Sequence, residues 1–130
     1  MAMMKELEQR ITERWPAWFN VAGDARESLM RYGFEHGDGW FKLAWRLCEQ
    51  LEQPIGASKQ ESGCAFQVLQ VKQKFGGLRF YTKYGNDAVS RAIEAAQVES
   101  FHTCEVCGKP GACRGAVWLA TDCDEHAYGG

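Results

Sequence analysis

The feature that most constrains this chain is a pair of short metal-binding motifs near its C-terminal end. Cys104 and Cys107 form a C-x2-C motif, and after fifteen intervening residues Cys123 and His126 form a C-x2-H motif. Thiolates and imidazoles at these spacings are typical tetrahedral zinc ligands, because each motif can direct both of its side chains at one ion. Four protein ligands complete the coordination shell, so the sequence predicts a structural zinc ion.

Two other residues leave the ligand set open. Cys113 lies between the two motifs and His102 lies just before the first, so either could replace one of the four ligands. Neither has a partner at motif spacing, which favours the original set. Disulfides are the alternative use of cysteines, but the chain begins with charged residues and lacks an apolar signal segment. We therefore expect a cytoplasmic protein whose reduced thiols bind metal.

Length and composition limit the remaining choices. With 130 residues, 45% of them hydrophobic, the chain can bury one core. We expect one compact domain, with a helical and β-hairpin core over residues 1–100 and a zinc-binding module over residues 101–130 packed on it. A formal net charge of −2 argues against non-specific coating of nucleic acid. No apolar run approaches the roughly 20 residues of a membrane span, so we expect no membrane partner.

Apolar residues recur at helical spacing in four segments. They predict helices over residues 3–14, 24–32, 40–53 and 87–101, the first stopped by Pro16 and the last capped by Asn86. The segment 40–53 has a continuous apolar stripe and should be the central core helix. Pro54 and the residues 56–63 should form a loop.

Between residues 66 and 84 the period changes to two, which predicts an antiparallel hairpin. With Gly76 and Gly77 as the turn, Lys74 lies opposite Arg79. One face is mostly apolar, includes Phe75, and should pack on the helices. The opposite face contains no acid and consists of Lys72, Lys74, Arg79, Tyr81 and Lys83.

The predicted fold is therefore α+β, with helices packed on one face of a small antiparallel sheet and a treble-clef-like zinc module at the C-terminus. Within that module, residues 111–120 should form a short hairpin with residues 117–119 as an apolar strand.

The basic face predicts an anionic neighbour, because like charges opposite one another on a sheet repel. The neighbour could be internal, since Glu94, Asp122, Asp124 or Glu125 could fold over the face, or the face could simply be solvated. Alternatively, the face binds an acidic protein surface, or binds phosphates while Tyr81 stacks on bases. A protein partner is our preferred interpretation and a nucleic acid is the alternative.

Catalysis has little support in the sequence. The deaminase and H-E-x-x-H signatures are absent, and a full zinc shell leaves no activated water. His36 could act as a general base, and an enzyme with an unrecognised site near His36 is a further alternative, but spacing places no nucleophile beside it. Trp18 and Phe19 are the aromatic pair expected to be most exposed. They could anchor a partner, but packing against the first helix is the favoured role.

Three segments occur in a fixed order: GFEHGDGWF at 33–41, VKQKFGGLRFY at 71–81 and the cluster from Cys104 to His126. Together they resemble a family of small uncharacterised proteins encoded by bacteria, phages and prophages. The pattern departs at His36, where that family has a cysteine. The resemblance implies a phage or mobile-element setting and a place in the host cytoplasm. Small proteins there commonly bind and disable a host or defence component, or act as accessory nucleic-acid binders.

Overall fold

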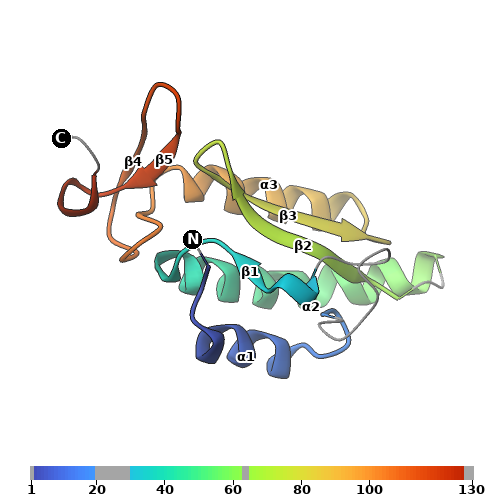
Figure 1. Ribbon diagram of the computed structural model, residues 1–130. Coiled ribbons are helices and arrows are strands. Elements are labelled where there is room, and N and C mark those ends of the chain that lie inside the picture. The colour runs from blue at the N-terminus through green and yellow to red at the C-terminus, as the bar shows by residue number, and fades with distance from the viewer. Residues whose placement is uncertain (1, 20–29, 63–64, 128–130) are drawn as a thin grey trace.

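A computed structural model describes residues 2–19, 30–62 and 65–127 of the chain (Figure 1). It has the predicted α+β architecture. The helix expected over residues 24–32 lies mostly outside the described residues, and its last three residues form a 3-10 turn. The elements in chain order are α1 (Lys5–Arg14), a 3-10 turn (Met30–Tyr32), β1 (Phe34–Glu35), a 3-10 turn (Asp38–Trp40), α2 (Phe41–Ser62), β2 (Gln67–Lys74), β3 (Gly77–Lys83), α3 (Asp87–Ser100), β4 (Ala112–Arg114), β5 (Ala120–Asp122) and a 3-10 turn (Asp124–His126).

The predicted hairpin forms and is joined by a strand that the sequence did not predict. β2 and β3 pair antiparallel, whereas β1 pairs in parallel with β2 through Phe34 beside Val71 and Glu35 beside Lys72. The strand order is β1-β2-β3. Because β1 has only two residues, it shows no alternation that a pattern search could detect. The sheet is therefore mixed and not wholly antiparallel.

The turn of the hairpin lies one residue earlier than predicted. Phe75 and Gly76 have positive φ angles of 55° and 83°, and Lys74 pairs with Gly77, so these two residues form the turn. Gly77 serves a different purpose, because a Cβ atom there would collide with the ring of Phe101. Packing against that ring, and not turn geometry, accounts for the second glycine.

The corrected register changes two details of the hairpin. Arg79 lies opposite Lys72, where Lys74 was predicted. Phe75 was predicted on the apolar face but stands in the turn, 64% exposed. From Gln70 to Tyr81 the two faces keep their predicted residues, because a shift of two residues in the pairing preserves the alternation. A bulge between Val68 and Gln70 breaks that alternation, and Val68 is buried. Val71 and Phe80 pair across the strands and are both buried.

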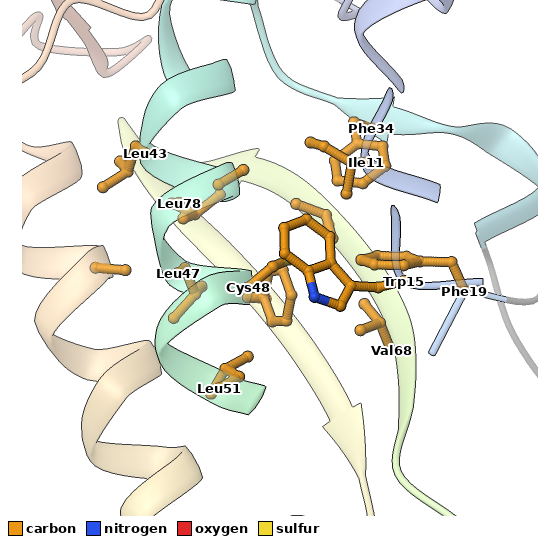
Figure 2. Close-up of a cluster of buried hydrophobic side chains, with 14 of the residues drawn as sticks. Ile11, Trp15, Phe19, Phe34, Leu43, Leu47, Cys48, Leu51, Val68 and Leu78 are labelled. Carbon is orange, nitrogen blue, oxygen red and sulfur yellow. The ribbon is translucent and has the colours of Figure 1, made fainter. Parts of the chain in front are cut away.

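The core lies between the apolar face of the sheet, α1 and α2 (Figure 2). The predicted stripe of the central helix is confirmed, because all of its members are buried. These are Trp40, Ala44, Leu47, Cys48 and Leu51. Trp15, which follows α1, packs into the same cluster beside Cys48, Phe19 and Val68. Burial of this set provides the apolar surface on which the sheet rests.

The central helix does not stop at Pro54 as predicted, because α2 continues to Ser62. Pro54 removes one helical N–H, which normally ends or bends a helix. Ile55, which follows it, is buried four residues after Leu51 on the same stripe, and the carbonyl of Pro54 accepts a hydrogen bond from Asn86. Tertiary contacts on both sides of the proline therefore outweigh its helix-breaking tendency.

Trp18 and Phe19 are not an exposed pair, and they pack beside the end of the first helix, which was their favoured role. Phe19 is buried and bridges to Val68 of β2, and Trp18 is half-buried and stacks on Trp15 with ring centroids 5.7 Å apart. No helix among the described residues is both long and apolar enough to cross a membrane.

Candidate metal centre and the surface beside it

The first pair of cysteines lies in a tight turn that follows α3. The N–H of Gly108 donates to the carbonyl of Cys104 at 2.9 Å, and the N–H of Cys104 donates to the carbonyl of Lys109 at 2.8 Å. These bonds fold the chain back on itself, so that Cys104 and Cys107 project the same way. The second pair lies in the last 3-10 turn, where the N–H of His126 donates to the carbonyl of Cys123 at 3.1 Å.

The four predicted ligands come together. Their ligand atoms all lie within 4.8 Å of one another. Nδ1 of His126 is 3.1 Å from Sγ of Cys123 and 3.7 Å from Sγ of Cys104, and Sγ of Cys107 is 3.7 Å from Sγ of Cys123. In a tetrahedron of ligands about 2.3 Å from a central ion, neighbouring ligands are about 3.8 Å apart. The cluster therefore has the dimensions of a four-coordinate metal site.

Backbone groups prepare one of these thiols to bind a cation. Burial disfavours the thiolate of Cys104, but hydrogen bonds from the backbone N–H groups of Cys107, Cys123 and Val106 outweigh it and lower the pKa of Cys104 to about 6. Metals bind the thiolate form of cysteine. The turn thus stabilises the charge state that a metal requires.

The two alternative ligands lie outside the cluster. Sγ of Cys113 is exposed on β4 and lies 3.9 Å from the carbonyl of Phe75, and His102 is exposed at the end of α3. None of the five cysteines among the described residues forms a disulfide. The geometry therefore favours the ligand set chosen from motif spacing.

The metal centre is fixed to the core by the residue that follows its first ligand. The carboxylate of Glu105 accepts a hydrogen bond from the N–H of Gly37 at 2.8 Å, and its backbone carbonyl accepts one from the N–H of Gly39 at 2.7 Å. The indole of Trp40 donates to the carbonyl of Thr103 at 2.8 Å. Sequence reasoning missed Glu105, because a single acid beside a ligand carries no spacing signal.

The second strand pair holds the metal centre against the β2–β3 hairpin. The hydroxyl of Thr121 in β5 donates to the carbonyl of Gly76 at 2.6 Å, so the tip of the β2–β3 hairpin lies against the strands of the β4–β5 hairpin (Figure 1). Residues 117–119 were predicted as a strand, but β4 and β5 flank them and they form the connecting loop. Val117 and Trp118 in this loop are 86% and 87% exposed.

Two of the four acids that could have neutralised the basic face are engaged elsewhere. Arg114 lies 2.7 Å from the carboxylate of Asp122 and 3.1 Å from that of Asp124. Across the described parts of the chain, the four cations of the basic face form no ion pair with an acid. These cations are Lys72, Lys74, Arg79 and Lys83. The face is open to solvent or to a partner.

His36 is wholly buried between the rings of Phe34 and Trp40, at centroid distances of 5.9 and 5.5 Å. Its Nδ1 lies 2.8 Å from the carbonyl of Gly37, and no hydrogen-bond partner for Nε2 is found in the described ranges. Burial lowers the pKa of His36 to about 4. A general base must reach its substrate, and this ring is shielded from solvent.

Comparison with models of known protein families, with curated proteins and with solved structures gives no match.

Proposed function

We propose that this chain is a non-enzymatic, zinc-stabilised binding module that acts by binding a protein partner. The donor set of three thiolates and one imidazole suits zinc, and four protein ligands leave no open position for a substrate. The order of cysteine turn, hairpin and helical turn resembles a treble clef. In this role the metal holds a surface in place and does no chemistry.

The observation that carries the proposal is the exposed loop of the β4–β5 hairpin. Val117, Trp118 and Leu119 are exposed in this loop, and β5 at its base contacts the tip of the β2–β3 hairpin through Thr121 and Gly76. Contiguous exposed apolar side chains of this kind mark interaction sites. Aromatic residues, and Trp above all, dominate the binding energy of protein interfaces.

The chemistry of this loop favours a protein over a nucleic acid. Bases stack on aromatic rings, but Val117 and Leu119 are aliphatic and gain only from burial in an apolar pocket. The unpaired cations nearby would then meet acids at the rim of the same interface. With the phage-like sequence pattern, the proposed partner is a host or defence component.

A capture experiment tests this function. Tagged protein loaded with zinc is incubated with host lysate, and captured proteins are compared between wild type and Trp118→Ala. Trp118 makes no contact that the fold needs, so the variant should fold normally and lose the partner by about tenfold or more in affinity. Val98→Ser, at another exposed apolar position, is the matched control. Equal capture by wild type and Trp118→Ala would contradict the role of the loop.

The basic face favours a nucleic acid as the second candidate. Lys72, Lys74, Arg79 and Lys83 lack ion pairs within the described segments, and Tyr81 is exposed among them. Binding through phosphates weakens steeply with salt. A labelled oligonucleotide should then bind at low salt, and Lys72→Glu and Arg79→Glu should abolish the binding. No binding at low salt would remove this candidate.

A further inference from the structure

The outer edge of β3 is not hydrogen-bonded to another strand in the described part of the chain. β3 is the last strand in the order β1-β2-β3, and within the described residues it pairs only with β2. In an antiparallel strand, the backbone groups of successive residues point alternately toward the partner strand and away from it. The N–H of Leu78 donates to Oγ of Ser100 in α3 at 2.9 Å, so it points away from β2. The same alternation directs the backbone groups of Phe80 and Thr82 to the outer edge.

A groove follows this edge. The end of α3 covers the start of β3 at Gly77 and Leu78, and farther along β3 the groove lies between the strand and Ile93 and Gln97 of α3. The residues that line the groove come from the hairpin and from α3. They are Lys74, Phe75, Arg79, Phe80, Tyr81, Ile93 and Gln97. Residues 79, 80 and 81 are consecutive, and successive side chains of a strand point to opposite faces. A groove that touches all three therefore runs along the strand edge.

The charges beside the groove determine what fits it. Lys74 and Arg79 line it and Lys83 ends the strand, and none of the three forms an ion pair with a described acid. A second copy of β3 would bring its own cations against these, and like charges on paired strands are destabilising. An acidic strand would instead neutralise them.

We propose that an extended acidic segment of the protein partner adds to β3 as a further strand in this groove. This inference rests on the proposed function and deepens it by naming the chemistry of the partner. The segment's backbone pairs with the outward groups of Phe80 and Thr82, as in other cases of strand addition. Its side chains alternate: acidic residues meet Arg79 and Lys83 on the open face, and apolar residues meet Ile93 of α3.

Amide exchange of the zinc-loaded full chain provides the first test. The probe is a mixture of synthetic octapeptides with Glu at alternate positions and Val, Ile or Leu between them. In the free protein, the N–H groups of Phe80 and Thr82 should exchange fast and those of Arg79 and Tyr81 slowly. The acidic peptides should slow the first pair by about tenfold or more. Unchanged exchange at Phe80 and Thr82, or equal protection by peptides with Lys in place of Glu, would overturn the proposal.

Two substitutions at one position provide the second test. Thr82→Pro removes only an outward N–H, which edge strands tolerate, and Thr82→Val keeps it. Peptide affinity should fall about tenfold in Thr82→Pro and change little in Thr82→Val. Arg79→Glu should reverse the preference, so that the Lys peptides bind better. Equal affinities of the two Thr82 variants would overturn strand addition.

Capture from host lysate distinguishes a failure of this inference from a failure of the proposed binding function. A partner retained by wild type and by Thr82→Pro alike would overturn strand addition and leave the binding function standing. A wild-type protein that captures no partner at all would overturn the binding function itself.

Discussion

The carboxylate of Glu105 accepts a hydrogen bond from the backbone N–H of Gly37, with 2.8 Å between oxygen and nitrogen. The two residues are far apart in the sequence, and each stands at the boundary of a different part of the fold. Glu105 follows the metal ligand Cys104, and Gly37 precedes the turn that leads into α2. The bond therefore links the metal centre directly to the start of the core helix.

Removal of this carboxylate should destabilise the whole fold. Glu105→Ala leaves the N–H of Gly37 buried without an acceptor, which costs about 1–3 kcal/mol. Glu105→Gln keeps an acceptor oxygen and should cost less. Urea unfolding at saturating zinc measures both free energies. Equal stability of Glu105→Ala and wild type would show that water or another group takes over the bond.

The close approach of Gly39 to the metal module predicts a strong effect of one methyl group. A Cβ at Gly39 would collide with the backbone carbonyl of Cys104 and lie 2.6 Å from the carbonyl of Glu105, neither of which can rotate away. Gly39→Ala should cost about 1–3 kcal/mol as an overpacking change. Gly56→Ala is the matched control, because no atom lies within 4 Å of the new methyl in α2, and it should stabilise by roughly 1 kcal/mol. Thermal unfolding of the two variants should therefore shift in opposite directions.

Metal removal should unfold residues 101–127 and loosen the start of α2. The free energy of metal binding is folding free energy where no preformed site exists without the metal, and zinc-finger peptides bind zinc with about 10–16 kcal/mol. A chelator, or Cys107→Ser, should lower the melting temperature. It should also speed amide exchange at Gly37 and Gly39. Elemental analysis should first establish one zinc per chain. An unchanged melting temperature of zinc-loaded protein after addition of the chelator would contradict a structural metal.

Acid should destabilise the fold through His36. A histidine of the unfolded chain has a pKa of 6.5, and burial lowers that of folded His36 to about 4. Above pH 6.5 both states are neutral and the residue contributes no pH dependence. Between pH 6.5 and 4 the unfolded chain takes up a proton that the folded protein does not, so the free energy of unfolding falls by up to roughly 3 kcal/mol. His36→Met should show a shallower slope in this interval, and parallel slopes would contradict the assignment.

Local patterns predicted those parts of the fold that neighbouring residues determine. The helix from Asp87 to Ser100 was predicted within one residue, and its cap is confirmed by the bond from the N–H of Val89 to Asn86. The cluster of three cysteines and one histidine was predicted equally well, because two intervening residues is a spacing that backbone geometry alone turns into proximity.

The errors occurred where distant contacts decide the structure. α2 passes Pro54 because Ile55 is held in the core, and Gly77 is a glycine because it packs on Phe101, although the sequence suggested that it belonged to the turn. The exposed tryptophan is Trp118 and not Trp18, since Trp18 finds Trp15 to stack on. Neither a period nor a propensity contains this information. The groove beside β3 could not be predicted either, because the sequence does not show which strand lies at the edge of the sheet.

The bond between Gly37 and Glu105 also has a consequence for synthesis on the ribosome. Its donor leaves the exit tunnel 68 residues ahead of its acceptor, so the loop before α2 must wait for the cysteine turn to emerge. Until then the nascent chain holds an incomplete loop, and this part of the fold can close only near the end of translation.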